Sequence, residues 1–231
     1  MFFAFHKKSL YFLIIFAFFL ASVCIYSAAK TEFVSVPRRD VTVVIDAGHG
    51  GVDGGSVGKF TGVIESNLNL IYAKNLREKL TAYGFRVVMT RSDGNGLYDP
   101  LAKNLKKSDM KKRKEIIESS NADLVLSVHM NSYPRESSHG SQVFFAKGNE
   151  SGEKLASSVQ QELKSLLNNT NKTAKVGDYF IVNCTSLPAC LIECGFLSNR
   201  EEESLLQTKD YQDKFCYAVT CGVIAFFGVS F

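Results

Sequence analysis

Paired cysteines are missing from this 231-residue sequence, which contains no C-x-x-C motif. Apart from Cys24, in an apolar run near the start, the cysteines are odd in number: Cys184, Cys190, Cys194, Cys216 and Cys221. An odd set without paired spacing predicts neither a disulfide framework nor a cysteine zinc site. We therefore expect small buried apolar side chains, which is the usual role of free cysteine.

A strong excess of charge is also missing. The sequence holds 27 Lys and Arg against 23 Asp and Glu. Lys7, Lys8 and Lys30 lie in the first thirty residues, which contain no acidic residue. Without these three, 24 basic residues face 23 acidic ones. Because nucleic-acid binders usually present a clearly basic face, no nucleic acid is expected as a partner.

The first thirty residues are typical of an export signal. Lys7 and Lys8 precede an uncharged apolar run over residues 10–26, which ends at Ser27-Ala28-Ala29. Small residues at 27 and 29 suit a cleavage site, whereas the length of the run also suits an uncleaved membrane anchor, which needs ~17–25 residues. We predict export, with residues 1–29 as a signal peptide or, the favoured alternative, a membrane anchor. Residues 30–40 are then a linker.

Beyond residue 40, predicted strands alternate with predicted helices. Apolar or β-branched runs predict strands over residues 41–46, 85–90, 123–130, 141–147, 178–182 and 189–194. Apolar residues at helical spacing predict helices over residues 65–83, 110–120, 153–167, 200–206 and 210–227. The pattern predicts a single α/β domain with a six-stranded, mainly parallel sheet flanked by helices on both faces. The strongly basic face of the 110–120 helix is interpreted as solvated surface.

Polar residues stand where predicted strands end. His49 follows the first strand, and His129 and Glu193 lie near the ends of the third and sixth. Glu65 starts the first helix, across a glycine-rich loop. Open α/β sheets place their sites at this edge. Two imidazoles and a carboxylate, with a position left for water, are a usual ligand set for catalytic zinc, and a further carboxylate can move protons.

Each of these residues also has an ordinary structural explanation. A single His at a strand end is usually a hydrogen-bonded structural residue, and Glu65 alone is a helix N-terminal acid favoured by the dipole. Glu193 is harder to explain this way, because it sits in an apolar strand where an unpaired carboxylate is costly. Taken together, they favour a metal site. His139 lies among polar, Ser-rich neighbours and is not expected to be a ligand.

Other chemistries fit the glycine-rich loop poorly. Seven glycines between residues 48 and 62 let the backbone approach a ligand or metal closely. A phosphate-binding loop fails on spacing, because Asp53 takes the place of a required glycine and Phe60 that of the Ser or Thr. Ser56 and Ser127 lack a nucleophile-elbow context, so a serine hydrolase is not expected.

The motifs around these residues resemble those of the zinc N-acetylmuramoyl-L-alanine amidases, the Amidase_3 family. In the order of that family they are residues 44–51 with 53–55, Glu65 with Asn69-Leu70, Thr90-Arg91, residues 127–132, and residues 192–199. The similarity runs from about Val41 to the C-terminus. It implies that residues 41–231 form a zinc amidase catalytic domain with a six-stranded sheet.

The resemblance also implies roles for four residues. His49, Glu65 and His129 would hold Zn²⁺, and Glu193 would be the catalytic carboxylate. The reaction implied is hydrolysis of the amide between the lactyl group of N-acetylmuramic acid and the L-alanine of the stem peptide in peptidoglycan. A zinc carboxypeptidase or endopeptidase acting on peptidoglycan, and a catalytically silent wall-binding module, are the alternatives.

Within the family, the chain is most similar to the spore-cortex, or germination-specific, branch. That branch implies removal of stem peptides as the first step towards muramic-δ-lactam, on the cell-wall or cortex side of the membrane. Only residues 133–140 separate the second histidine motif from the next strand, so the self-inhibitory helix of larger relatives is not expected. An accessory exported protein is then a candidate for control of the enzyme.

Overall fold

The computed structural model describes Tyr11, residues 15–18 and residues 40–228. The chain divides into two compact units, residues 1–37 and residues 38–231. In the first unit, Tyr11 and residues 15–18 are helical. Among the described residues, no helix combines the length and apolar character needed to cross a membrane. The predicted signal or anchor and the linker lie mostly outside the described residues.

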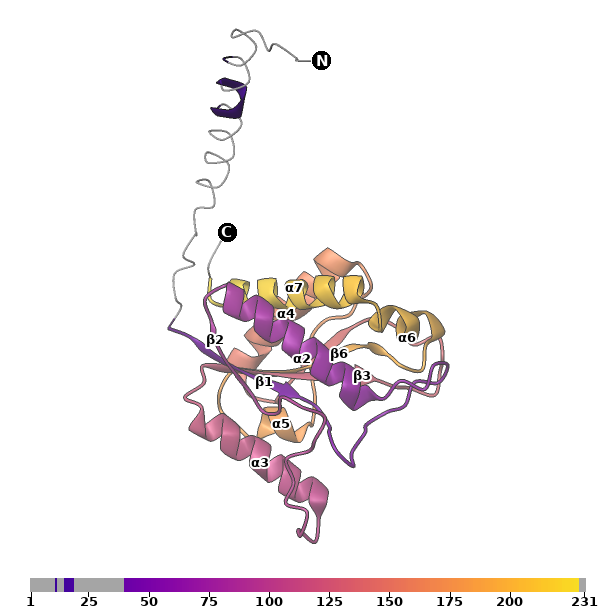
Figure 1. The fold of residues 1–231 in the computed structure, drawn as a ribbon. Helices are drawn as coiled ribbons and strands as arrows, with labels where there is room; N and C mark the ends of the chain where they lie inside the picture. The colour runs from indigo at the N-terminus through magenta and orange to yellow at the C-terminus, as the bar shows by residue number, and fades with distance from the viewer. Residues whose placement is uncertain (1–10, 12–14, 19–39, 229–231) are drawn as a thin grey trace, which may run out of the picture. The chain divides into compact units, whose positions relative to one another are not determined.

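The second unit is built on one sheet of six strands (Figure 1). The strands are β1 (Thr42–Ala47), β2 (Arg86–Met89), β3 (Leu124–Asn131), β4 (Gln142–Phe145), β5 (Lys175–Val176) and β6 (Ala189–Phe196). Their order across the sheet is β2-β1-β3-β6-β4-β5. All neighbours are parallel except β4 and β6, which are antiparallel. The predicted six-stranded, mainly parallel sheet is confirmed.

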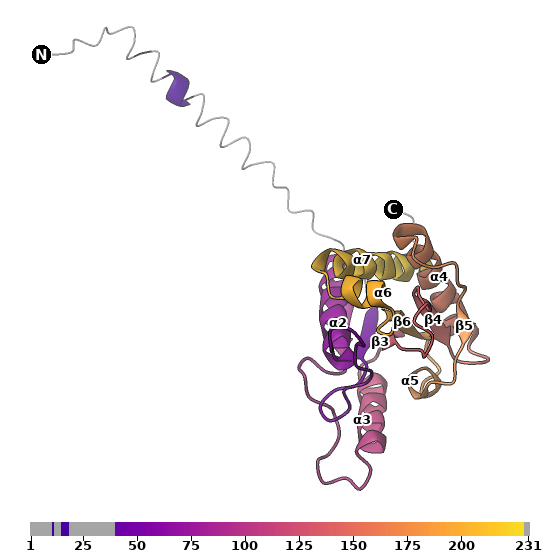
Figure 2. The same cartoon turned by 90° about the vertical axis from the view of Figure 1, so that its right-hand side faces the viewer.

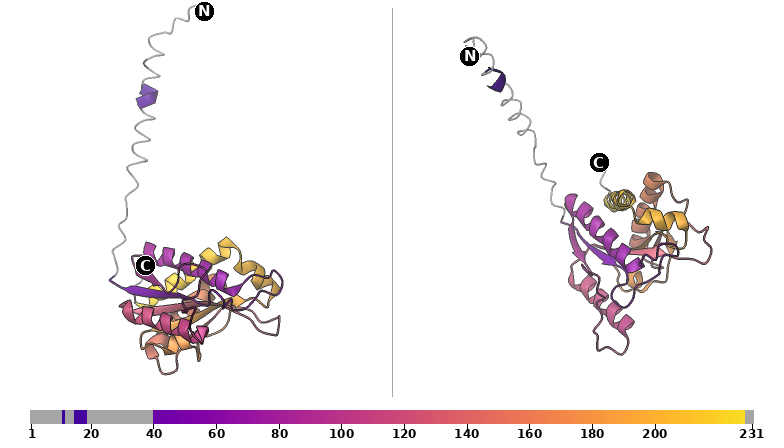
Figure 3. Two further views of the ribbon diagram at one scale, coloured as in Figure 1. Left: turned by 60° about the horizontal axis from the view of Figure 1, so that its bottom comes forward. Right: turned by 45° about the vertical axis from the view of Figure 1, so that its right-hand side comes forward.

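Helices cover both faces of the sheet, as predicted. They are α2 (Glu65–Ala82), α3 (Leu105–Ser119), α4 (Glu150–Leu167), α5 (Phe180–Asn183), α6 (Arg200–Leu206) and α7 (Lys209–Phe226). Figures 2 and 3 show α2, α4 and α7 on one face, with α3 and α5 on the other. The second face is therefore the more thinly covered one.

Alternating side chains of the strands supply both cores. In β1, Val43 and Ile45 belong to the larger apolar cluster, and Val44 belongs to the smaller one. In β6, Cys190 faces the larger cluster and Leu191 the smaller. Successive strand residues point to opposite faces, so a sheet covered on both sides needs continuous apolar runs. This explains why these strands were recognisable as uninterrupted apolar segments.

The cysteines behave as the sequence predicts. All five from Cys184 to Cys221 are free, and Cys190, Cys194 and Cys216 are buried. Burial raises the pKa of the Cys190 thiol. The expectation of buried side chains thus holds for three of the five, whereas Cys184 and Cys221 are half-buried.

The prediction of a strand over residues 178–182 is wrong. The fifth strand is shorter and earlier, at Lys175–Val176, and Phe180–Asn183 forms the helical turn α5. Ile181 and Val182 are buried in the smaller cluster. A short apolar run can be buried equally well as a strand or as a helical turn, so its periodicity does not distinguish the two.

Candidate metal centre

The polar strand residues lie on the thinly covered face of the sheet. Because side chains alternate, Asp46 shares the face of Val44, and Glu193 shares the face of Leu191. His129 is the register partner of Glu193 on the neighbouring strand. Parallel strands β1, β3 and β6 thus bring their carboxyl ends to one edge, on the side of α3 and α5.

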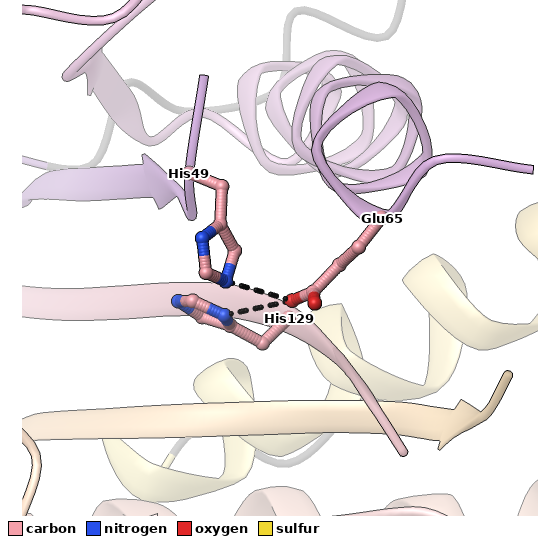
Figure 4. Close-up of side chains that lie close together, drawn as sticks. All are labelled: His49, Glu65 and His129. Carbon is pink, nitrogen blue, oxygen red and sulfur yellow. Dashed lines mark hydrogen bonds and ion pairs between the residues drawn. The ribbon is translucent and has the colours of Figure 1, made fainter. Parts of the chain in front are cut away.

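Three side chains converge at this edge (Figure 4). The Nε2 atom of His49 lies 3.2 Å from Oε1 of Glu65, and Nδ1 of His129 lies 3.0 Å from the same oxygen. The two imidazole rings meet edge to face, with their centroids 4.9 Å apart. One donor atom from each of His49, Glu65 and His129 lies within 4.8 Å of the others. Among the described residues, this is the group that could hold a metal ion.

Glu65 is fixed from several directions. It is the first residue of α2, and its Oε2 accepts a hydrogen bond from the Ser56 amide at 2.8 Å. Its Oε1 accepts from the Met130 amide at 3.2 Å and from Nδ2 of Asn69 at 3.3 Å. Burial opposes ionisation, but hydrogen bonds from His129 and His49 outweigh it and lower the pKa of Glu65. The carboxylate is therefore ionised and aimed between the two histidines.

His49 occupies a strained position in the glycine-rich loop. Its φ of 60° lies in the left-handed region, which non-glycine residues rarely adopt. Residues strained in this way cluster at functional sites. At Gly48, a Cβ atom would come within 2.2 Å of the His129 ring, so only glycine allows this approach. The Nδ1 atom of His49 lies 2.8 Å from Oδ1 of Asp53. This contact is an ion-pair distance and not a well-aligned hydrogen bond, because Nδ1 of His49 has no hydrogen-bond partner among the described residues.

Glu193 differs from every other carboxylate at this edge. It is 8% exposed, and its Oε2 has no hydrogen-bond partner among the described residues. Burial raises the pKa of Glu193 to about 7, against the opposing effect of His129. Glu193 and the three converging side chains line one cleft of about 430 Å³. The cleft therefore holds a carboxyl group that can exchange protons near neutral pH.

Arg113 of α3 holds the backbone of the loop that carries His49. Its guanidinium donates to Oδ1 of Asp46 at 2.6 Å and to Oδ2 of Asp109 at 2.5 Å. It also donates to the backbone carbonyls of Ala47 and His49, at 2.8 and 2.7 Å. Arg113 is 1% exposed, so the interpretation of the α3 basic face as solvated surface is wrong for this residue.

Arg91 fastens the same loop to α2. Its Nη2 donates to the carbonyls of Gly48 and Ser66 at 2.9 and 2.8 Å, and its Nε donates to Ala47 at 2.8 Å. The sequence motif Thr90-Arg91 carried no assigned role. The structure shows that this buried arginine holds the glycine-rich loop in place by hydrogen bonds to its backbone carbonyls.

Replacing Arg113 by methionine is expected to lower the free energy of unfolding by about 3 kcal/mol or more. The change leaves Asp46 and Asp109 buried without their guanidinium, and breaking a buried ion pair typically costs 3–5 kcal/mol. Urea denaturation measures the loss. Lys112→Met on the same helix removes an exposed ion pair with Glu115 and is expected to cost under ~1 kcal/mol. Equal stability of the two variants would contradict a structural role for Arg113.

His139 does not reach the centre. It is exposed, and its Nδ1 lies 2.9 Å from the carbonyl oxygen of Ser137 in its own loop. His139 is not among the residues that line the cleft. It therefore lies apart from His49, Glu65 and His129.

Residues 43–225 match the N-acetylmuramoyl-L-alanine amidase family, Amidase_3. The chain belongs to this family. The match begins at the second residue of β1, continues beyond β6 and includes every residue that lines the cleft. It confirms the resemblance carried by the sequence motifs. The protein is an N-acetylmuramoyl-L-alanine amidase, a hydrolase of peptidoglycan.

Individual relatives agree with this assignment. The germination-specific N-acetylmuramoyl-L-alanine amidase of Bacillus subtilis (strain 168) is 36% identical over 198 residues, which are 84% of this chain and 82% of the relative. The solved CwlD amidase of Clostridioides difficile, in complex with the GerS lipoprotein, superimposes with a TM-score of 0.79 at 34% identity. That match covers 83% of this chain and 100% of the other.

A second solved relative shows the same fold. The catalytic domain of CwlV, an N-acetylmuramoyl-L-alanine amidase from Bacillus (Paenibacillus) polymyxa var. colistinus, matches with a TM-score of 0.73 at 28% identity. It covers 82% of this chain and 99% of that domain. The α/β architecture of this amidase is thus the architecture of its relatives.

Proposed function

We propose that this amidase holds a zinc ion between His49, Glu65 and His129 and uses Glu193 as its catalytic acid/base. The convergence of two imidazole nitrogens on Oε1 of Glu65, at 3.2 and 3.0 Å, carries the proposal. Tetrahedral ligands at ~2.0–2.1 Å from zinc are about 3.3 Å apart, which is close to both of these N···O distances. One donor atom from each of the three residues lies within 4.8 Å of the others. Two imidazoles and one carboxylate are a ligand set that catalytic zinc sites use.

A zinc ion held by these three residues would supply a Lewis acid for the amide carbonyl and would lower the pKa of water. Glu193 takes a proton from the attacking water and delivers it to the leaving nitrogen. The new bond joins the water oxygen to the lactyl carbonyl carbon, and the C–N bond to L-alanine breaks. The products are a lactyl carboxylate on the glycan and a peptide with a free amino terminus.

Product analysis tests the bond that is cleaved. Peptidoglycan is digested with the purified protein, and the soluble and insoluble products are identified by mass spectrometry. We expect free stem peptides that begin with L-alanine and glycan strands that keep their lactyl groups. Released terminal amino acids would support a carboxypeptidase, cleaved cross-links would support an endopeptidase, and unchanged material would support a silent wall-binding module.

We further propose that the protein is exported and acts on spore cortex, where it begins the formation of muramic-δ-lactam. The germination-specific relative, 36% identical, supports this role, and the apolar N-terminal run supports export. Deletion of the gene in the source organism is expected to give spores whose cortex lacks muramic-δ-lactam while the vegetative wall is unchanged. Normal lactam content in such spores would contradict the cortex role.

An accessory exported lipoprotein is proposed to control this amidase. The CwlD amidase of C. difficile was solved in complex with the GerS lipoprotein, and its fold matches this chain closely. Zinc content and cortex digestion are measured for the protein alone and with a purified GerS-like lipoprotein. A partner that binds the zinc-loaded form raises the apparent zinc affinity. If the protein alone holds one zinc tightly and digests cortex equally fast, this proposal is wrong.

A further inference from the structure

A second groove opens from the catalytic cleft along α3. It has a volume of about 470 Å³ and shares Lys106, Met110 and Phe180 with the cleft. Figure 2 shows α3 and α5, the elements that carry these residues, on the same side of the sheet. The groove is lined by Asn104, Lys106, Lys107, Met110, Lys111, Lys114 and Phe180. We call it the lysine groove.

Cationic side chains dominate the lysine groove, and no acidic residue is among those that line it in the described chain. Lys111 and Lys114 are ion-paired within α3, to Glu115 and Glu118. Lys106 and Lys107 form no ion pair with any described residue. Lys106 lies close enough to Asp53 to help lower the pKa of that carboxylate, whereas no such interaction involves Lys107. Two lysines without an ion pair therefore face a groove that leads to the reacting centre.

Fold stability does not account for these two lysines. They occupy the first turn of α3, which contains no acidic residue. The helix dipole disfavours positive charge at this end. A negatively charged ligand in the lysine groove would pair with both lysines, whereas within the described chain only Lys106 interacts with an acidic side chain, that of Asp53.

The other extension of the cleft has a different character. Beyond Ser132, which it shares with the cleft, lie Tyr133 and Lys59. Lys59 is ion-paired with Glu136, so this extension carries no uncompensated charge among its described lining residues. Tyr133 is 57% exposed and offers an aromatic surface. The two ends of the cleft are thus suited to different chemical groups.

We propose that the lysine groove binds the stem peptide of the substrate through its carboxylates. The amide that the enzyme cleaves joins a sugar to a peptide, so the two parts of the substrate leave the reacting centre in different directions. The peptide ends in a carboxylate, whereas N-acetylated sugars are neutral. Charge complementarity therefore places the peptide against Lys106 and Lys107, and Met110 and Phe180 give its aliphatic side chains an apolar surface. The inference rests on the amidase activity and not on the metal.

The test uses two soluble N-acetylmuramoyl peptides, one with free carboxylates and one with every carboxylate converted to carboxamide. For the double variant Lys106→Gln/Lys107→Gln, we expect KM for the first substrate to rise about three- to tenfold with kcat unchanged. KM for the carboxamide substrate should stay the same. Lys106→Arg/Lys107→Arg should restore most of the affinity for the first substrate. Added NaCl should narrow the difference between double variant and wild type.

Lys154→Gln is the matched control. Lys154 is exposed on α4, which covers the opposite face of the sheet, and it carries the same charge. Its KM for both substrates should equal that of the wild type. An equal rise of KM for both substrates in the double variant, a fall in kcat alone, or no change would overturn the proposal. A wild-type protein that cleaves neither substrate would instead contradict the amidase activity on soluble fragments.

Discussion

Glu193→Gln is expected to leave a folded, metal-loaded protein that hydrolyses its substrate about 10²–10⁴-fold more slowly. The side chain lies in the cleft beside the three converging residues but is not one of them. Glutamine keeps the shape of glutamate and cannot shuttle the proton between water and the leaving nitrogen. Replacing a buried carboxylate whose Oε2 has no partner among the described residues should not lower stability.

Three measurements on one preparation separate the possible causes of such a loss. Metal content reports the ligand set, urea denaturation reports the fold, and muropeptide release reports the chemistry. Glu202→Gln is the matched control, because Glu202 is also 8% exposed but accepts hydrogen bonds from the amides of Gly140 and Phe196. It should keep activity within a few-fold. Full activity in Glu193→Gln would remove Glu193 from the reaction.

The fold was predictable because both faces of the sheet are covered. Strands buried on two sides read as continuous apolar runs, and the helices between them show their own period. The order β2-β1-β3-β6-β4-β5 was not predictable from one sequence, since pairing joins segments far apart in the chain. The wrong prediction of a strand over residues 178–182 has a local cause. The two buried residues, Ile181 and Val182, can be buried in a helical turn as well as in a strand.

The converging residues were predictable from their places at strand and helix ends. The backbone topology alone predicts that these residues lie close together, because the carboxyl ends of parallel strands share one edge. They are His49, Glu65 and His129. Asp53, which lies 2.8 Å from His49, was not assigned a role, because its loop conformation decides where the carboxylate points.

The buried role of Arg113 was not predicted, because most of its neighbours in the sequence are lysines. The residues around it are basic and exposed, so the average character of α3 indicates a solvated face. A signal was nevertheless present: Asp109, Arg113 and Ile117 recur every four residues, and these are the residues that α3 buries. An acid and a base at that spacing, together with Asp46 in an apolar strand, indicate a buried ion pair more strongly than either segment does alone.

His129→Ala is expected to abolish activity by a different route from Glu193→Gln, namely by loss of the metal. It removes one of the three proposed ligands, and metal affinity should fall by more than ~100-fold, beyond the 10–100-fold typical of losing a supporting residue. The matched control is His139→Ala, an exposed histidine in the loop after β3. This control should keep wild-type zinc content and activity.

Chelation distinguishes a lost ligand from a lost fold. Wild-type protein treated with a chelator should lose activity and regain it when Zn²⁺ is restored at a low concentration. His129→Ala should regain activity only partly, and only at much higher Zn²⁺ concentration, because His49 and Glu65 remain in place. Zinc should stabilise the wild type against urea more than the variant, since a ligand stabilises the state that binds it. If His129→Ala binds zinc as tightly as the wild type, the converging trio is not the metal site, and the buried Glu65 between two histidines would then be a hydrogen-bonded structural carboxylate.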